Sequence, residues 1–345
     1  MSAKSFLIVG AGLSGLTLAR QLILAGQKVT LVDAGYNHSS VIAAGFINPL
    51  VFRRMTKSWR LDEFTPNLIQ FYQDWENETG ASFFHPITIR RLFSSEEEKA
   101  SWLSKQHRPD FQNYMFEVTE EDLNYDLALN PFGSARVKNS FYVDATLFLQ
   151  EAKRWVARFG TIISETMNYD ALSTDGIYQG VSYDGVIFCE GYEVCRNPWF
   201  GTIPIHSTKG ETLEIESDAL PRTESLNRKC FVLPLKNGKF KIGSTYVWQT
   251  ANFELTQEGK ETLVENLQVI SNAPFQVSGH QAGVRPTTLD RRPVMGKHPK
   301  YPHLMIFNGL GAKGYMLAPT LSGEMCDFIL NDEPVDRECR LERFL

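Results

Sequence analysis

Apolar and polar positions near the start of the chain predict a strand, a helix and a second strand. Residues 6–9 are an apolar run, and residues 13–23 repeat apolar side chains at helical spacing. Gly26 stands where such a helix would end, and a second apolar run covers residues 29–32. We therefore expect a β-α-β unit within the first 33 residues.

The rest of the chain continues this alternation of helical and extended patterns. Helical spacing recurs over residues 62–78, 94–107, 142–160, 256–270 and 317–330. Buried strands are expected at residues 161–163, 185–191 and 304–307. Residues 210–216 and 229–248 alternate as antiparallel strands, with a turn at Asn237-Gly238.

Parallel β-α units at both ends therefore enclose antiparallel strands in the middle, which predicts an α/β fold with two interleaved domains. The first is a Rossmann-like nucleotide-binding domain with a doubly wound, mostly parallel sheet, expected at residues 1–80, 140–205 and 280–345. The second is an α+β substrate domain built on an antiparallel sheet, expected at residues 81–139 and 206–279.

Three glycines between the first strand and the first helix form a Gly-x-Gly-x-x-Gly motif. Asp33 ends the second strand 18 residues after Gly15, which is the spacing of a dinucleotide-binding fingerprint. Gly10 permits a tight turn, Gly12 lets the backbone approach a pyrophosphate, and Gly15 lets helix and strand pack closely. Asp33 would accept hydrogen bonds from the adenosine ribose. A glycine turn without a nucleotide is the alternative, and the motif alone does not separate NAD from FAD.

The composition narrows the class of protein. With 345 residues, 43% hydrophobic and 22% charged, the chain is typical of a globular protein of about two domains. With a net charge of -5, the chain has no overall positive potential that would attract nucleic acid or anionic lipid. Five scattered cysteines without a Cys-x-x-Cys pair indicate reduced, structural thiols, and we expect no metal site. We also expect no signal peptide and no membrane span, and hence a cytoplasmic protein.

Eight sequence blocks occur in a fixed order from residue 5 to about residue 330. They cover residues 10–15, 43–49, 142–144, 186–191, 203–211, 233–245, 283–296 and 309–319. In this order the chain resembles the FAD-dependent D-amino acid oxidase superfamily, in its glycine oxidase and sarcosine oxidase branch. Residues 50–140 lie outside the resemblance.

The resemblance implies an FAD-dependent oxidoreductase that acts on a small amine or amino acid. In the family, flavin takes a hydride from the carbon that bears the amine, and the imine hydrolyses. O2 or another electron acceptor then reoxidises the flavin. No cysteine lies between Arg285 and Pro319, where some sarcosine oxidases attach the flavin, so we expect non-covalent FAD.

The resemblance also implies which residues contact the cofactor. They come from the glycine turn, the end of the second strand, the small residues that follow it, the strand near residue 190 and the loop before the last helix. These residues are Gly10, Ala11, Gly12, Leu13, Ser14, Gly15, Asp33, Ala34, Ser40, Ala44, Gly45, Phe46, Ile47, Tyr169, Glu190, Gly191, Arg285, Gly311, Ala312, Lys313, Gly314, Tyr315 and Met316.

Three cations are expected to carry the chemistry. Arg285 matches the family arginine that holds the substrate carboxylate bidentately, with a structural ion pair, for example to Asp290, as the alternative. Lys241 aligns with a lysine that sarcosine oxidases place near the flavin to assist oxygen reduction, and a solvated lysine is the alternative. Lys313 and the amides of its loop would stabilise negative charge on the reduced flavin.

The substrate is expected to contact Arg53, Tyr246 and Ala312 as well as Arg285. Arg53 belongs to a basic cluster with Arg54, Lys57 and Arg60, which we expect to line the substrate entrance. A solvated helical face is the alternative. Convergence of the cluster would indicate a substrate with a second anionic group.

Two departures from the family pattern leave the substrate open. Glu190 replaces a residue that is usually small, and Phe231 replaces a frequent tyrosine. The loop at residues 309–314 also resembles the oxidase half of a bacterial bifunctional enzyme, so a tRNA wobble-uridine-modifying oxidoreductase of the carboxymethylaminomethyl-uridine type is one alternative. A flavin-binding protein without turnover and an NAD-dependent dehydrogenase are the others. The choice between oxidase and dehydrogenase and the oligomeric state stay open.

Overall fold

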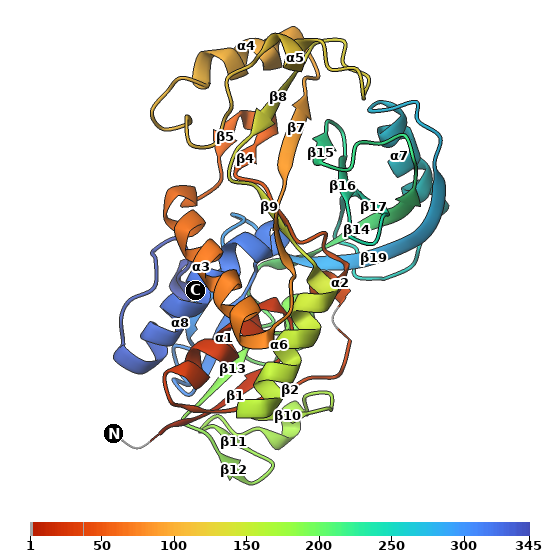
Figure 1. Cartoon of the computed structure of the whole chain (residues 1–345). Helices are drawn as coiled ribbons and strands as arrows, with labels where there is room; N and C mark the ends of the chain where they lie inside the picture. The colour runs from red at the N-terminus through yellow and green to blue at the C-terminus, as the bar shows by residue number, and fades with distance from the viewer. Residues whose placement is uncertain (1–2, 37) are drawn as a thin grey trace.

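Two large sheets organise the computed structural model, which describes residues 3–36 and 38–345 (Figure 1). The first sheet has six strands in the order β10-β2-β1-β13-β21-β20. Five of them run parallel, namely β10 (Thr161–Ile163), β2 (Lys28–Val32), β1 (Ser5–Val9), β13 (Gly185–Phe188) and β21 (Leu304–Asn308). The edge strand β20 (Val294–Lys297) pairs antiparallel with β21. The predicted mostly parallel sheet is confirmed.

Strand alternation gives the six-stranded sheet two buried faces. Phe6 and Ile8 face one core, and Leu7 and Val9 face another. Helices α1 (Leu13–Leu24), α6 (Ala145–Phe159) and α8 (Gly314–Asn331) cover the first face, and α3 (Leu61–Thr79) packs against α8 and α6. The second face is covered by the hairpin of β11 (Ile177–Tyr178) and β12 (Val181–Ser182) and by the short helices η3 (Gly191–Arg196) and η5 (Leu341–Phe344).

The last helix begins earlier than its sequence pattern predicts. Apolar periodicity predicts a start near residue 317, but α8 begins at Gly314. The short helix η4 (Gly311–Lys313) leads directly into it, so that the chain is already helical before the first apolar repeat. The start of α8 therefore lies at the glycine loop itself.

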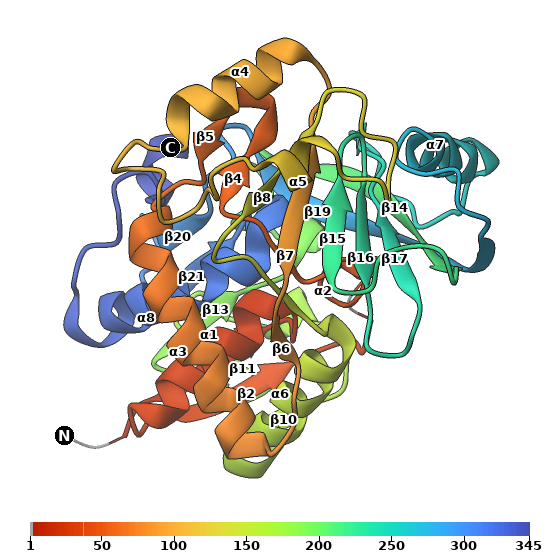
Figure 2. The same cartoon turned by 45° about the horizontal axis from the view of Figure 1, so that its top comes forward.

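The second sheet is built from the middle of the chain and is mostly antiparallel (Figure 2). Its order is β18-β14-β17-β16-β15-β7-β8, and β19 pairs with β14. Only the pair β15–β7 is parallel among its described pairings. The strands are β18 (Val247–Trp248), β14 (Ile205–Glu216), β17 (Phe240–Gly243), β16 (Phe231–Pro234), β15 (Glu224–Asn227), β7 (Thr88–Leu92), β8 (Ser134–Val137) and β19 (Gln276–Thr288).

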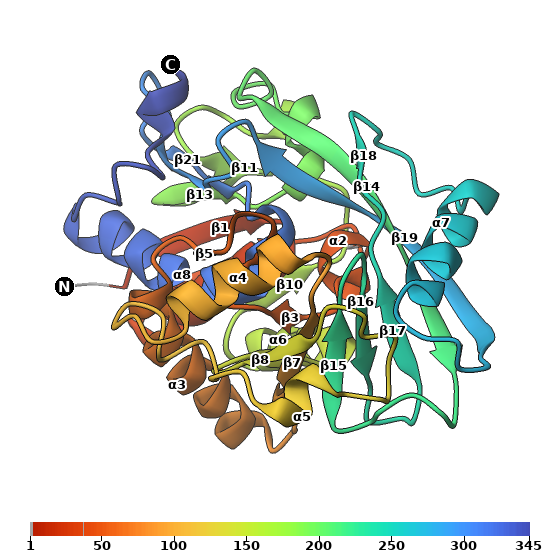
Figure 3. The ribbon, with the colours of Figure 1, turned by 90° about the horizontal axis from the view of Figure 1, so that it is seen from above.

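Helix α7 (Gln257–Gln268) lies on the outer side of these strands (Figure 3). Phe240 and Ile242 of β17 pack against Leu263 and Leu267 of this helix. Alternation then directs Lys241 to the opposite face of the sheet. The prediction that Phe240 and Ile242 form the core of this domain is confirmed.

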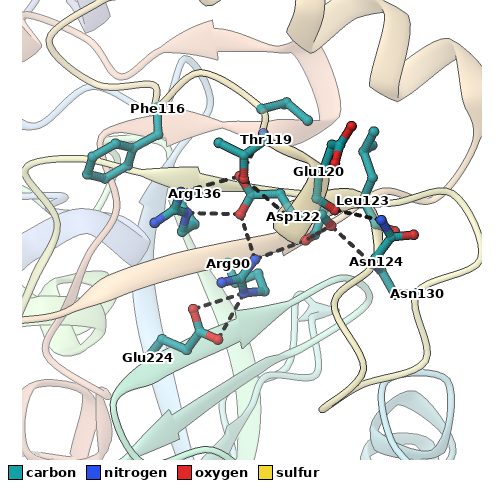
Figure 4. A network of polar contacts seen from close by, with 12 residues as sticks. Arg90, Phe116, Thr119, Glu120, Asp122, Leu123, Asn124, Asn130, Arg136 and Glu224 are labelled. Carbon is teal, nitrogen blue, oxygen red and sulfur yellow. Dashed lines mark hydrogen bonds and ion pairs between the residues drawn. The ribbon is translucent and has the colours of Figure 1, made fainter.

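A buried ion network joins four segments at the far end of the second sheet (Figure 4). Asp122 of α5 (Glu120–Leu123) accepts hydrogen bonds from Arg90 Nη1 at 2.8 Å and from Arg136 Nε at 2.9 Å. Arg90 Nε also donates to both carboxylate oxygens of Glu224 at 2.9 Å. Burial alone would raise the pKa of Asp122, but hydrogen bonds from Thr119, Arg136 and Arg90 lower it. Along the chain, helix α4 (Glu96–Lys105) lies between β7 and α5.

Short elements connect the two sheets. They are α2 (His38–Ile42), β3 (Phe46–Ile47), β4 (Leu50–Val51), η1 (Phe52–Arg54), β5 (Thr56–Lys57), β6 (Phe84–Pro86) and β9 (Phe141–Val143). The short helix η2 (Tyr169–Ala171) follows β10 and packs on the second face of the first sheet. Strand β9 pairs with both β3 and β6 and leads into α6. The segment from α2 to β5 therefore lies between the first sheet and the second.

Three further observations concern the part of the chain that the structure describes. None of its helices combines the length and apolar character needed to cross a bilayer. All five cysteines are free. No group of three or more His, Cys, Asp or Glu side chains within the described ranges could hold a metal ion.

Candidate active site

A cavity of about 500 Å3 extends between the two sheets, and residues of both line it. The glycine turn and Asp33 lie at one end. Strands β14, β16 and β19 contribute Thr212, Phe231 and Arg285 at the other end. Residues 39–52 and 308–316 contribute most of the wall between them. One cavity therefore joins the glycine turn to strands of the second sheet.

The glycine turn has the close packing that its sequence predicts. Gly10 has a φ of +100°, and a Cβ there would lie 2.7 Å from the carbonyl oxygen of Cys189. A Cβ on Gly15 would lie 1.9 Å from the carbonyl oxygen of Gly10. Side chains are therefore excluded at both positions, and the N-terminus of α1 is brought against the cavity. This cradle fits a pyrophosphate, which helix N-termini bind through their amides and dipole.

Asp33 is buried and already bound by the protein. Its Oδ1 accepts a hydrogen bond from Ala11 N at 3.1 Å, and its Oδ2 accepts one from Gly35 N at 3.3 Å. Lys153 of α6 forms an ion pair with Oδ2. A ribose hydroxyl at this carboxylate would therefore share Oδ2 with Lys153, a residue that no sequence motif identifies.

Arg285 presents an incompletely paired guanidinium at the opposite end of the cavity. Its Nη2 donates to Ser244 Oγ at 2.7 Å, whereas its buried Nη1 has no hydrogen-bond partner among the described residues. The guanidinium carbon lies 5.2 Å from the centre of the Tyr246 ring. Burial lowers the pKa of Arg285. A carboxylate in the cavity would supply the missing acceptor.

The alternative reading of Arg285 as a structural ion pair is wrong. Asp290, its expected partner, instead accepts from Arg343 Nε at 2.8 Å. Space for the guanidinium comes from Gly210 on the adjacent strand, where a Cβ would lie 2.1 Å from Arg285 Nη2. The neighbouring Thr212 also lines the cavity, and its buried Oγ1 has no partner among the described residues.

Lys313 lines the cavity but points toward the residues that flank β4 and β5. Its Nζ donates to Asn48 O at 3.1 Å and to Ser58 Oγ. Burial lowers its pKa to about 8. The cation is thus held beside the cavity by neutral acceptors, which leaves its charge uncompensated there.

Lys241 is buried and does not line the cavity. On β17, Lys241 and Gly243 face the same side of the sheet. Gly243 pairs with the cavity-lining Thr212, whereas Lys241 lies two residues earlier and pairs with Glu214. Burial lowers its pKa, an effect that Glu214 and Asp144 oppose. A position beside the flavin therefore stays a prediction.

The basic cluster does not converge on this cavity, contrary to expectation. Arg53 and Arg54 are exposed on η1, while Lys57 forms an ion pair with Asp62. Arg60 pairs with carboxylates of α3 and α8 and of the C-terminal segment, namely Glu63, Glu324 and Asp336. The tight turns from η1 through β5 into α3 send these side chains in different directions, and none of the four lines the main cavity.

Glu190 lines the cavity and binds two polar neighbours. It accepts hydrogen bonds from Tyr169 OH at 2.5 Å and from Asn197 Nδ2 at 2.9 Å. Burial raises its pKa to about 7, although both hydrogen bonds act to lower it. Tyr169 therefore lies behind Glu190 rather than in the wall.

Most predicted cofactor residues lie in the cavity wall. The wall contains Gly10, Ala11, Gly12, Leu13, Ser14, Asp33, Ser40, Ala44, Gly45, Phe46, Glu190, Gly191, Arg285, Gly311, Ala312, Lys313, Gly314, Tyr315 and Met316. The predicted site residues outside it are Gly15, Ala34, Ile47, Arg53, Tyr169, Lys241 and Tyr246. Sequence reasoning did not single out Gly210, Thr212, Asn227 and Ser244. Gly210 and Ser244 fall within two of the matching blocks, but nothing marks Asn227.

Comparison with known proteins places the chain in context. The model of the family described as FAD dependent oxidoreductase matches residues 5–327. Glycine oxidase of Pseudomonas aeruginosa is 24% identical, with 96% of each chain covered. The tRNA 5-methylaminomethyl-2-thiouridine biosynthesis bifunctional protein of Saccharophagus degradans is 20% identical, over 98% of this chain and 54% of its own length. Among solved structures, glycine oxidase from Geobacillus kaustophilus superposes with a TM-score of 0.82 at 18% identity, covering 96% of each chain.

Proposed function

The chain belongs to the FAD-dependent oxidoreductase family, and on this basis we propose that it oxidises the C–N bond of a small amine or amino acid bearing a carboxylate. The observation that carries the proposal is the buried Arg285 Nη1, a cationic donor at the cavity end that has no acceptor among the described residues. A buried, unpaired charge is costly, and it is retained where a ligand supplies its partner.

The residues of the cavity fit FAD, bound without a covalent link. The glycine turn and the N-terminus of α1 would hold the pyrophosphate, and Asp33 the adenosine ribose. Residues 43–46 and 311–316 would hold the flavin ring between the two sheets. When bound, FAD supplies the hydride acceptor that none of the twenty side chains can provide.

Arg285 then fixes the substrate. Its fork would bind the carboxylate bidentately, while Ser244 holds one arm of the guanidinium and Tyr246 covers it. A carboxylate held at two oxygens leaves its α-carbon little freedom, so its C–H bond can be aligned with the flavin ring. Lys313 would place positive charge beside the ring edge and stabilise the electron density that the flavin gains.

An anaerobic assay with a substrate panel tests the proposal. The purified holoprotein is mixed with glycine, sarcosine and D-amino acids, and the bleaching of the flavin absorbance is followed. We expect at least one of these to reduce the flavin, with release of the corresponding carbonyl compound. Heat denaturation of the same preparation should release intact FAD. Release of FMN, or a flavin that no carboxylate-bearing amine reduces, contradicts the proposal.

Two further measurements separate the remaining possibilities. Hydrogen peroxide formed in air identifies O2 as the acceptor, whereas reduction without peroxide identifies a dehydrogenase. Flavin reduction by tRNA carrying carboxymethylaminomethyl-uridine, but by no free amine, would replace the proposed substrate with the tRNA alternative.

A further inference from the structure

A second cavity, of about 580 Å3, adjoins the substrate end of the first. The two share Phe52 and Asn227 in their walls. Phe52 packs beneath the Arg91 guanidinium, whose carbon lies 4.8 Å from the ring centre. A substrate arm that extended from Arg285 past these two residues would reach the second cavity.

The second cavity is rich in positive charge. Four arginines and two glutamates line it. Arg91 is neutralised locally, since its Nε donates to Glu98 Oε1 at 2.7 Å and its Nη1 donates to Asn227 Oδ1 at 2.8 Å. The other charged residues in the wall are three arginines, Arg53, Arg54 and Arg228, and one acid, Glu97. They leave an excess of two positive charges.

Arg228 is held in this wall with part of its guanidinium unpaired. Its Nη1 donates to Val269 O at 3.0 Å, but Nε and Nη2 are buried without a hydrogen-bond partner among the described residues. Burial and the neighbouring Arg91 lower its pKa. A small rotation of the guanidinium would offer these N–H groups to an acceptor in the cavity, and an anion would also relieve the repulsion from Arg91.

Arg53 and Arg54 differ from the other cations of their segment. Lys57 and Arg60 are bound to carboxylates, whereas Arg53 and Arg54 form no ion pair with any described residue. Both are exposed at the cavity wall on η1, next to Phe52. Carboxylates therefore neutralise Lys57 and Arg60, which lie outside the second cavity. Arg53 and Arg54, which line it, have no such partner among the described residues.

We propose that the second cavity binds a second anionic group of the substrate, through Arg53, Arg54 and Arg228. This inference rests on the proposed function, and it narrows the substrate class. The substrate is a small secondary amine or amino acid with two anions, one carboxylate on Arg285 and a carboxylate or phosphonate at the end of its other arm. Glycine and sarcosine, with one anion, would leave the second cavity unused.

Binding of unreactive thioether analogues tests the inference without turnover. Methylthioacetate carries one carboxylate, and thiodiglycolate carries two on the same skeleton. (Carboxymethylthio)propionate lengthens the second arm, and (phosphonomethylthio)acetate replaces its carboxylate. Each is titrated into the holoprotein, and the dissociation constant is read from the change in the flavin spectrum. We expect at least one dianion to bind about 10- to 100-fold more tightly than methylthioacetate, as one charge-assisted contact provides.

Variants locate the effect. The double variant R53A/R54A should reduce the ratio of dianion to monoanion affinity to near one, and the more conservative R53Q/R54Q should do the same. The matched control K57A removes a cation of the same segment outside either cavity, and its ratio should match that of the wild type. Equal affinity of mono- and dianions in the wild type, or an equal loss in K57A, overturns the inference.

The substrate panel keeps the two proposals distinguishable. Reduction of the flavin by sarcosine and by iminodiacetate with equal kcat/KM upholds the proposed function and rejects the second anion site. Tight dianion binding with no reduction by any amine rejects the proposed function and supports the anion site. Preference of the carboxylate or of the phosphonate analogue identifies the anion itself.

Discussion

Replacing Arg285 by methionine separates ligand binding from a structural role. Methionine fills a similar volume without charge, so the substitution removes the unpaired Nη1 and the bond to Ser244. A carboxylate bound bidentately loses about 3–4 kcal/mol, since hydrogen bonds to charged groups contribute about 1.5–3 kcal/mol each. The affinity for methylthioacetate should therefore fall by roughly 100- to 1,000-fold.

The thermal stability of R285M should not fall together with its ligand affinity. The Nη1 atom of Arg285 is buried without a carboxylate partner, so its desolvation opposes folding, and R285M should leave the Tm of the ligand-free holoprotein unchanged or raise it. The control is R90M, because Arg90 is a buried arginine that is paired, with Asp122 and Glu224. Breaking that network should cost about 3–5 kcal/mol.

Flavin spectra and thermal melts of the two variants decide the matter. Destabilisation of R285M as strong as that of R90M would refute the ligand-binding role, because Arg285 would then hold the fold together. Binding of methylthioacetate to R285M as tight as to the wild type would refute it as well.

Four further predictions follow from individual groups. Lys241→Met should slow the reoxidation of reduced flavin by O2 and spare anaerobic reduction in stopped-flow, if its buried ammonium lies near the flavin; equal oxidative rates would remove that role. Burial raises the pKa of Glu190 to about 7 from 4.5, so the folded protein retains a proton that the unfolded chain has lost. Its contribution to stability is full below about pH 4.5 and is lost as the pH rises through 7, so E190Q should flatten the fall in Tm between pH 5 and pH 8. Gly210→Ala should displace the Arg285 guanidinium and weaken methylthioacetate binding at least tenfold while FAD stays bound, as measured by the flavin spectrum. Asp122→Asn should lower the free energy of unfolding by about 3–5 kcal/mol in a urea titration and leave the ligand affinity unchanged.

The local sequence by itself determined the elements that bear the cofactor turn. The apolar runs around Gly10, the helical repeat after it and the strand that ends at Asp33 all depend on residues that are neighbours in sequence. The same holds for the face of β17, where alternation alone separates Lys241 from Phe240 and Ile242. Such patterns are readable because their period is set by the geometry of a single helix or strand.

Only the tertiary structure decided which charges are paired. Arg285 and Asp290 are close in sequence, yet Asp290 pairs with Arg343. The Arg285 guanidinium instead occupies the space that a side chain on Gly210 would fill. The basic cluster reads as one patch along the chain, but Arg60 reaches carboxylates of α8 and the C-terminal segment while Arg53 and Arg54 stay unpaired beside Arg228. The reason is physical: a charge is neutralised by whatever lies within a few ångströms, and strand pairing and helix packing set that neighbourhood over separations that no local period records.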